Sequence, residues 1–404
     1  MKREIINDPV FGFITIPNDF LYNLLRHPYL QRLSRIKQLG LTSYVYPGAQ
    51  HTRLHHSIGA MSLMNEAIAV LRSKGHEITE SEATSALACI LLHDVGHGPF
   101  SHVLERTLGA IHHEEISLLL MNKLDEESGG AFKECISIFK DEHPKKYLHQ
   151  LVSGQLDVDR LDYLKRDSFF TGVSEGNIGS ARIIKILDQR NGKLVVEAKG
   201  IYSIENFLLA RRLMYWQVYL HKTAVVAETM MINVMKRAKE LAMSGVEVFS
   251  TPALSYFLHN EINKEFFVND PKAIDYFTQL DDNDIWSSMK VWMNHEDKVL
   301  SLLSSGLVNR RLFKIESTTE MYNEDRVRQK IDEYTQYLDI SEHEAKYLVA
   351  YNTISNNIYN DEDDIIRILF EDGSVEEISE ASDTFDIDLL SKRVEKHYFS
   401  YLRL

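Results

Sequence analysis

The hydrophobic pattern of residues 17–300 is mostly that of helices. In ITESEATSALACILLHD (78–94), a capping box of Thr79 and Glu82 precedes apolar residues at helical spacing. Residues 203–241 are apolar on more than one face, which predicts one long buried helix beginning at Ser203. The clearest strand signal is KLVVEAKG (193–200) after the turn QRNG, which predicts a hairpin.

The pattern changes after Gly306. Strands are predicted for residues 311–318, 345–355 and 395–404, two further strands around a turn for 365–379, and helices for 325–338 and 382–394. We therefore expect a mainly α fold with a helical core (residues 1–305) and a smaller C-terminal α+β module (residues 306–404). The order β-α-β-β-α-β suits either a ferredoxin-like module or an irregular α+β appendage.

Composition narrows the class of protein. A chain of 404 residues with 44% hydrophobic residues can bury a sizeable core, and it has no apolar run of membrane-spanning length. The N-terminus lacks the apolar segment of a signal peptide and there are only two cysteines, so we expect a cytoplasmic protein without thiolate metal ligands. The net charge of −14 argues against broad nucleic-acid binding.

Candidate metal ligands gather in three segments: residues 51–59, 91–102 and 155–167. His93 and Asp94 are adjacent and can both reach one ion if a helix ends there, and Gly96 and Gly98 would let the backbone turn. One histidine from the first segment and one aspartate from the third would complete a four-ligand site. Imidazole and carboxylate ligands suit iron, manganese, nickel, cobalt or zinc.

Two polar stripes accompany these segments. Asp159, Tyr163 and Asp167 are four residues apart and would share one helix face with Arg160 beside them. A surface helix with ion pairs is the alternative. A second stripe on the helix expected from Ser203 would consist of Arg211, Tyr215, Tyr219 and Lys222. It would face a pocket or, alternatively, snorkel at the helix edge.

Seven motifs carry a resemblance to a known family: INDPVFG (6–12), QRLSRIKQLG (31–40), YPGAQHTRLHHSIG (46–59), LLHDVGHGPFSH (91–102), HHEEIS (112–117), DVDRLDYLKRD (157–167) and YLHK (219–222). In this order, over roughly residues 5–240, they resemble the HD-domain phosphohydrolases and, within them, the deoxynucleoside triphosphate (dNTP) triphosphohydrolases. The resemblance implies four metal ligands: His56, His93, Asp94 and Asp159. His55 is the rival of His56, but the family pattern R-x-x-H-S selects His56 through Arg53. We interpret His51 and His55 as ordinary polar surface residues.

The implied reaction is attack of water on the α-phosphorus of a dNTP, which releases a deoxynucleoside and inorganic triphosphate. A divalent ion (Mn, Fe, Ni, Co or Zn) would occupy the HD site, and Mg could accompany the triphosphate. His113 matches the general acid, Glu105 an assisting carboxylate, and His97 and His102 pocket histidines. The cations expected to meet the triphosphate are Arg53, Arg160, Arg211 and Lys222. The residues expected to read sugar and base are Gln38, Leu39, Tyr163 and Asp167, with Tyr215 and Tyr219 in the same pocket.

The sequence also departs from vertebrate members of this group. Tyr215 and Leu220 replace a pocket histidine and a glutamine, which changes the expected base contacts. Arg26 and Ser34 stand where those enzymes bind a guanine activator, so activation by GTP through the same contacts is not expected. Family members assemble as dimers or tetramers, which implies a homo-oligomer.

Two alternative functions follow from the same residues. The HD ligands are shared by hydrolases of other phosphate esters, such as nucleoside monophosphates, cyclic nucleotides or nucleic-acid ends. The second alternative is a nucleotide-binding regulatory protein with little turnover. The intact ligand set and His113 favour an enzyme.

Overall fold

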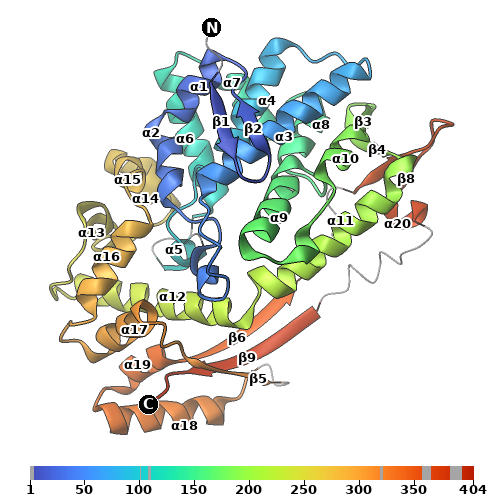
Figure 1. The fold of residues 1–404 in the computed structure, drawn as a ribbon. Coiled ribbons are helices and arrows are strands. Elements are labelled where there is room, and N and C mark those ends of the chain that lie inside the picture. Colours follow the sequence, from blue (N-terminus) through green and yellow to red (C-terminus); the bar gives the residue numbers. More distant parts are fainter. Residues whose placement is uncertain (1–3, 101, 108–110, 319–321, 357–364, 383–393) are drawn as a thin grey trace.

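The structure, a computed structural model, describes residues 4–100, 102–107, 111–318, 322–356, 365–382 and 394–404, and it is mainly helical (Figure 1). The first twelve helices are α1 (Asp19–Leu25), α2 (Pro28–Arg32), α3 (Arg53–Ser73), α4 (Glu80–Leu92), α5 (His102–Thr107), α6 (His113–Glu127), α7 (Lys133–Phe139), α8 (Lys146–Val152), α9 (Val158–Thr171), α10 (Ser180–Lys185), α11 (Ile201–Met214) and α12 (Lys222–Met243). The others are α13 (Pro252–Leu258), α14 (Lys264–Asn269), α15 (Pro271–Phe277), α16 (Asp282–Trp292), α17 (Lys298–Val308), α18 (Glu324–Leu338), α19 (Glu342–Ala345) and α20 (Ile378–Ala381). The predicted mainly α class is confirmed.

Local signals in the sequence set several element ends. The capping box of α4 forms as predicted, with the Thr79 N–H donating to Glu82 Oε2 at 2.8 Å and the Glu82 N–H donating to Thr79 Oγ1 at 3.2 Å. The predicted hairpin is also confirmed, because β3 (Leu187–Arg190) pairs antiparallel with β4 (Lys193–Glu197). Its turn residues Asn191 and Gly192 both have positive φ, as a two-residue hairpin loop requires.

The long helix predicted from Ser203 is wrong in one respect, because it is two helices. After α11 the chain makes a π-helical turn over Tyr215–Tyr219, in which the Leu220 N–H donates to the Tyr215 carbonyl at 2.7 Å. His221 is then extended, and its ring nitrogen accepts the Thr223 N–H and caps α12. A π turn at such a place is frequently functional, and this one carries two of the predicted site tyrosines.

The strands form three sheets. In the N-terminal hairpin β1 (Ile5–Asp8) pairs with β2 (Gly12–Thr15). A four-stranded sheet has the order β3-β4-β7-β8 and includes β7 (Arg367–Leu369) and β8 (Val375–Glu377). A three-stranded antiparallel sheet has the order β5-β9-β6 and consists of β5 (Lys314–Thr318), β9 (Val394–Tyr401) and β6 (Val349–Asn356).

The C-terminal residues are therefore an irregular α+β arrangement. The ferredoxin-like alternative is wrong, because that fold needs all its strands in one sheet. Here β7 and β8 belong to the sheet of β3 and β4, where β7 pairs in parallel with β4, and β5, β6 and β9 form a separate sheet. The helix predicted for 382–394 lies almost wholly outside the described residues. The division of the chain at residue 305 stays a prediction.

Three helices at the centre of the core position the candidate site. α3 packs against both α4 and α9, and α4 is apolar on nearly every face, with Leu87 to Leu92 all buried. In Figure 1, α12 runs between this helical body and the sheet β5-β9-β6. Within the described residues, no helix combines the length and the apolar character that a membrane span requires.

Candidate metal and active site

The four predicted metal ligands meet where three helices come together. His56 lies in the first turn of α3, His93 caps the end of α4, and Asp159 lies in the first turn of α9. His56 Nε2 is 3.0 Å and His93 Nε2 is 3.5 Å from Asp159 Oδ1. Asp94 Oδ1 is 3.4 Å from His93 Nε2, and Asp94 Oδ2 is 4.0 Å from His56 Nε2. Segments far apart in the chain thus bring His56, His93 and Asp159 within reach of one ion, and Asp94 lies beside them in an adjoining group with His97 and His113.

The tautomers of the two histidines fit a metal ion. His56 Nδ1 donates to Asp162 Oδ2 at 2.7 Å, and His93 Nδ1 donates to the Ile90 carbonyl at 2.7 Å. Both Nε2 atoms therefore carry lone pairs, and both are buried without a hydrogen-bond partner among the described residues. Metal-ligating histidines in proteins are oriented in this way. The two unsatisfied nitrogens beside Asp159 make the donor set suitable for a divalent cation.

The electrostatics of the site point the same way. Burial alone would lower the pKa of His56, but the adjacent carboxylates of Asp159 and Asp162 outweigh it and raise the pKa to about 10. Burial alone would raise the pKa of Asp159, but His56 and His93 bring it well below its usual range. The negative charge that raises the pKa of His56 is the charge that a bound cation would neutralise.

Asp162 is a site residue that sequence reasoning did not single out. It bonds His56, and its two oxygens also accept both ends of the Arg166 guanidinium at 2.9 Å. Arg166 in turn donates to Asp8 Oδ2 at 2.8 Å, and all three side chains are buried. Its signal in the sequence was the spacing of Asp162 three residues after the ligand Asp159, which places both carboxylates on neighbouring faces of one helix.

Gly59 lets this network form. A Cβ added there would lie 2.0 Å from Asp162 Oδ1 and 2.1 Å from Arg166 Nη2. Gly96 acts similarly at another contact, where an added Cβ would lie 2.0 Å from the His113 carbonyl oxygen. Gly96 lies in the turn that follows α4, as predicted, where the His97 N–H donates to the Asp94 carbonyl at 3.1 Å. Its φ is not positive, so glycine is required there by the close approach of α6 rather than by the turn itself.

Asp94 connects the metal ligands to the two predicted catalytic histidines. Its Oδ2 accepts from Arg53 Nη1 at 2.5 Å, and its Oδ1 accepts from His97 Nε2 at 3.3 Å. The rings of His97 and His113 stack, with centroids 3.8 Å apart and planes 15° apart. Burial and the charge of Arg53 lower the pKa of His97 to about 3, so this imidazole is neutral near pH 7.

The predicted stripe of α9 continues from the metal ligands into a tyrosine cluster. Tyr163 lies one turn after Asp159, with its ring centroid 6.5 Å from that of His56. Its ring is 5.9 Å from that of Tyr219, which in turn is 5.1 Å from that of Tyr215. The π turn thus places Tyr215 and Tyr219 of the second predicted stripe next to Tyr163 of the first.

The interpretation of His51 as a surface residue is wrong. Its side chain is 2% exposed, its ring stacks on Phe170 at 4.5 Å, and its Nε2 donates to Asp167 Oδ1 at 2.7 Å. The other oxygen of Asp167 accepts from the Tyr219 hydroxyl at 2.7 Å. His55 is exposed, as expected, and its Nδ1 accepts the Thr52 N–H at the start of α3.

The predicted sugar-reading residues lie next to His51. The Gln38 N–H donates to the His51 carbonyl at 3.0 Å, and Gln38 Oε1 is buried without a hydrogen-bond partner among the described residues. Leu39 packs against the core as a partly buried residue, as expected for helix packing. Gln38 Oε1 is therefore an acceptor available to a ligand.

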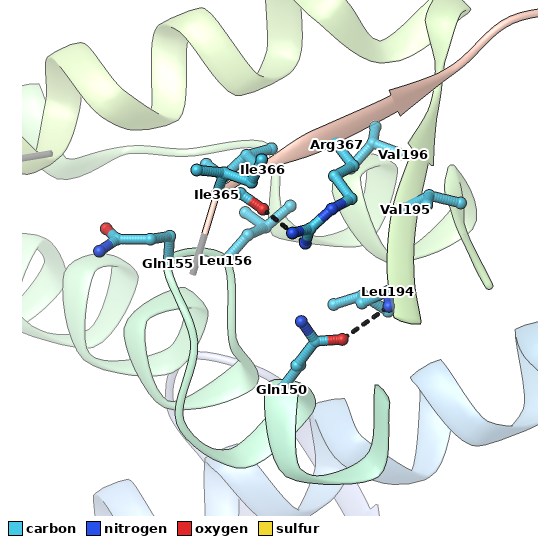
Figure 2. A pocket seen from close by; sticks show the side chains of 9 residues that line it. All are labelled: Gln150, Gln155, Leu156, Leu194, Val195, Val196, Ile365, Ile366 and Arg367. Carbon is cyan, nitrogen blue, oxygen red and sulfur yellow. Dashed lines mark hydrogen bonds between the residues drawn. The ribbon is translucent and has the colours of Figure 1, made fainter. Parts of the chain in front are cut away.

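Two predicted phosphate-binding cations share the loop that precedes α9. Arg160 donates to Asp157 Oδ2 and to the Gly154 carbonyl, and Arg211 Nη1 donates to Gln155 Oε1 at 2.9 Å. Gln155 and Leu156 of this loop also line a small cavity (Figure 2). Its volume of about 20 Å³ has room for about one water. Its lining residues are Gln150, Gln155, Leu156, Leu194, Val195, Val196, Ile365, Ile366 and Arg367. Arg367 of the C-terminal strand β7 thus lines the same cavity as Gln155, which is the partner of Arg211.

The structure does not place three of the predicted site residues in the histidine cluster. Lys222 begins α12 with an exposed side chain, and no described contact joins it to the histidine cluster. His102 and Glu105 lie in α5, but their side chains fall outside what the structure describes. Their predicted roles remain predictions.

A separate cluster of Glu82, Glu134 and His143 could be mistaken for a second metal site. His143 Nδ1 accepts the Lys145 N–H at 3.1 Å, so the proton of the neutral ring is on Nε2, 3.8 Å from an oxygen of each glutamate. Lys145 Nζ also bonds Glu82 at 2.7 Å. A protonated Nε2 is no metal ligand, and the cluster is an ion-pair network between α4 and α7.

The fold and the site define a metal-binding hydrolase, and comparison with known proteins identifies its family. The HD domain matches residues 53–167 and the HD associated region matches residues 178–251. A crystal structure of a phosphohydrolase from Bacteroides thetaiotaomicron is 60% identical and superimposes with a TM-score of 0.97 over 100% of both chains. The YwfO protein of Bacillus subtilis is 30% identical over 319 residues, which cover 78% of this chain and 72% of YwfO.

The chain belongs to the HD-domain phosphohydrolases, which confirms the resemblance seen in the sequence. The deoxynucleoside triphosphate triphosphohydrolase SAMHD1 homolog of Dictyostelium discoideum is 31% identical over 259 residues, which cover 59% of this chain and 50% of that protein. Human SAMHD1 is 29% identical over 282 residues. The chain thus spans about half the length of these dNTP triphosphohydrolases.

Proposed function

We propose that this phosphohydrolase cleaves dNTPs into a deoxynucleoside and inorganic triphosphate. The observation that carries the proposal is the continuity of the Asp159–Tyr163–Asp167 face of α9. The proposed ligand Asp159 lies in its first turn, and the carboxylate of Asp167, held by two donors, follows two turns later. A phosphoryl site and a hydroxyl-reading site would thus lie on one rigid element. The SAMHD1 relatives support the same substrate class.

We propose His56, His93, Asp94 and Asp159 as the ligands of a divalent ion, which polarises a phosphoryl oxygen and lowers the pKa of water when bound. Arg53, adjacent to Asp94, would neutralise charge on the α-phosphate. Arg160 and Arg211 would exchange their loop partners for the remaining phosphates, and the exposed ammonium of Lys222 would meet the outermost one.

Proton transfer falls to the stacked histidines. Water would attack the α-phosphorus, the bond to the 5′-oxygen would break, and that oxygen would take a proton from His113. The attacking water would lose one proton to solvent, and His113 would regain its proton from solvent before the next turnover. His97 is neutral and holds the ring of His113 by stacking at 3.8 Å. We propose Glu105 as an assisting carboxylate and His102 as a phosphate contact.

Sugar selection would come from the tyrosine cluster. The 3′-hydroxyl would donate to Asp167 and accept from the side-chain NH2 group of Gln38, and the Tyr163 ring would leave no room for a 2′-hydroxyl. Tyr215, Tyr219 and Leu39 would line the base side. The hydrogen bonds to the 3′-hydroxyl would reject a substrate that lacks this group, whereas the rejection of NTPs would rest on the crowding of the 2′-hydroxyl by Tyr163.

The test is product identification with manganese-loaded protein on the four dNTPs and the four NTPs, with the Asp159→Ala variant as the blank. Intact triphosphate with deoxynucleoside, and spared NTPs, is the expected result. Orthophosphate or pyrophosphate as product would refute the proposed attack, and equal turnover of NTPs would refute the sugar filter.

We also infer that the protein forms a homo-oligomer. Phe13 of the N-terminal hairpin is 78% exposed and Phe169 of α9 is 57% exposed. Exposed aromatic side chains of this kind are enriched at protein–protein interfaces. Light scattering coupled to size-exclusion chromatography tests this, and a mass of 46.7 kDa at micromolar concentration would contradict it.

A further inference from the structure

A buried carboxylate outside the matched HD segments holds two active-site loops together. Asp282, the first residue of α16, is 4% exposed. Its Oδ2 accepts the Lys37 N–H at 2.9 Å, and its Oδ1 accepts the Phe100 N–H at 3.3 Å. Lys37 directly precedes Gln38, and Phe100 lies three residues after His97. One side chain therefore fixes the distance between the sugar-reading segment and the histidine loop.

A buried guanidinium, that of Arg32, also binds the histidine loop. Arg32 is fully buried, and its Nη2 donates to the carbonyls of Val95 and His97, both at 2.8 Å. Its Nη1 donates to the Leu280 carbonyl at 3.1 Å, and its guanidinium lies 4.7 Å from the Phe277 ring centroid. The loop that carries Asp94 and His97 is thereby tied to the connection between α15 and α16. We call residues 280–282 the α16 corner.

Both groups are costly to bury. Among the described residues, neither Arg32 nor Asp282 has an oppositely charged side chain within ion-pair distance. A buried charge that is satisfied only by backbone groups adds little stability compared with an apolar side chain of similar volume. Its distinctive effect is geometric, because three carbonyls and two N–H groups of separate segments are held in one arrangement.

We infer that Arg32 and Asp282 are positioning residues, which hold Gln38 and His97 in register with the metal ligands through the α16 corner. The segment after residue 251 is then a working part of the active site. The roles of Gln38 and His97 rest on the proposed function, but the positioning of their backbone does not.

The test compares Asp282→Asn with Asp284→Asn. An asparagine at 282 has only one acceptor oxygen, so its NH2 group would face one of the two backbone N–H groups. One of the two hydrogen bonds to Lys37 and Phe100 would therefore be lost. Asp284 is the matched control, because it caps the same helix, with Oδ2 accepting the Asp281 N–H at 2.7 Å, and contacts neither loop. Metal content, unfolding midpoint, kcat and KM are measured for both variants on a dNTP and on bis(p-nitrophenyl) phosphate.

We expect Asp282→Asn to retain metal and to lose about 10- to 100-fold in kcat/KM, since displacements near 1 Å cost about that much. Asp284→Asn should stay within threefold of wild type. Equal kcat/KM for the two variants would overturn the inference. If the wild type does not hydrolyse dNTPs but cleaves bis(p-nitrophenyl) phosphate, only the proposed substrate is refuted. The two variants are then compared by their kcat/KM on that ester.

Arg32→Lys covers the case in which Asp282→Asn does not fold. A lysine keeps the charge but cannot reach all three carbonyls, so kcat should fall about tenfold or more while bound metal and the unfolding midpoint stay near wild type. Unchanged kcat in this variant would also overturn the inference.

Discussion

Substitution of Gly59 by alanine should damage the metal site through the helix contact behind it. The new methyl group would lie 2.0 Å from Asp162 Oδ1, whereas non-bonded atoms prefer about 3.5 Å, so α3 and α9 must separate by over 1 Å or the Asp162–Arg166 pair must move. Overpacking costs about 1–3 kcal/mol, and breaking a buried ion pair costs about 3–5 kcal/mol. The better helix propensity of alanine returns about 1 kcal/mol.

If the ion pair breaks, the free energy of unfolding should be about 2–4 kcal/mol lower, and overpacking alone would lower it by about 0–2 kcal/mol, measured by urea denaturation with the metal removed. Asp162 would also orient His56 less well, so the affinity for Mn²⁺ measured by calorimetry should fall about 10- to 100-fold. Gly179→Ala is the control, because its added Cβ would have no neighbour closer than 3.9 Å. If Gly59→Ala is as stable as this control and binds Mn²⁺ normally, the role assigned to the α3–α9 contact is wrong.

Three further predictions concern single side chains. Asp159→Ala should lose both bound metal and activity, measured by elemental analysis and turnover, and a variant that keeps both would refute the ligand assignment. His113→Ala should keep its metal and lose about 10²- to 10⁴-fold in kcat, and loss of metal instead would make His113 a ligand. Burial alone would raise the pKa of Asp297, but Arg237 lowers it, so this carboxylate stabilises the fold above its ordinary pKa of 3.8 and loses that effect as pH falls. Asp297→Asn should therefore be destabilised by about 1–3 kcal/mol at pH 7, with a difference from wild type that shrinks below pH 4, and a pH-independent difference would contradict this.

Much of the site could be predicted because its signals are local. Adjacent residues such as His93 and Asp94, or residues at helical spacing such as Asp159, Tyr163 and Asp167, share a direction whatever the rest of the fold does. The capping box of α4 and the β3–β4 turn are local in the same sense. The structure brings together the residues that these short-range features selected, and most of the predicted secondary structure forms, while the ligand roles stay a prediction.

The errors concern contacts between distant segments. His51 looks like one of several polar residues in HTRLHH, and only the approach of Asp167, 116 residues later, buries it. The apolar pattern continues from α11 into α12 without interruption, so it predicts one helix. The break arises because His221 caps a new helix there. Asp282 lies 245 residues from Lys37, and an acidic LDDND segment at a helix start reads as ordinary capping.

The buried series Asp8–Arg166–Asp162–His56 has a consequence for how the protein is made. His56 emerges from the ribosome 106 residues before Asp162, and Asp8 emerges 158 residues before Arg166. Until then the histidine has no partner to set its tautomer, and the N-terminal hairpin has no guanidinium to bind. A nascent chain shorter than about residue 166 therefore displays ligand histidines without a site, so the choice of metal is made by an almost finished domain and by the metals that meet it after synthesis.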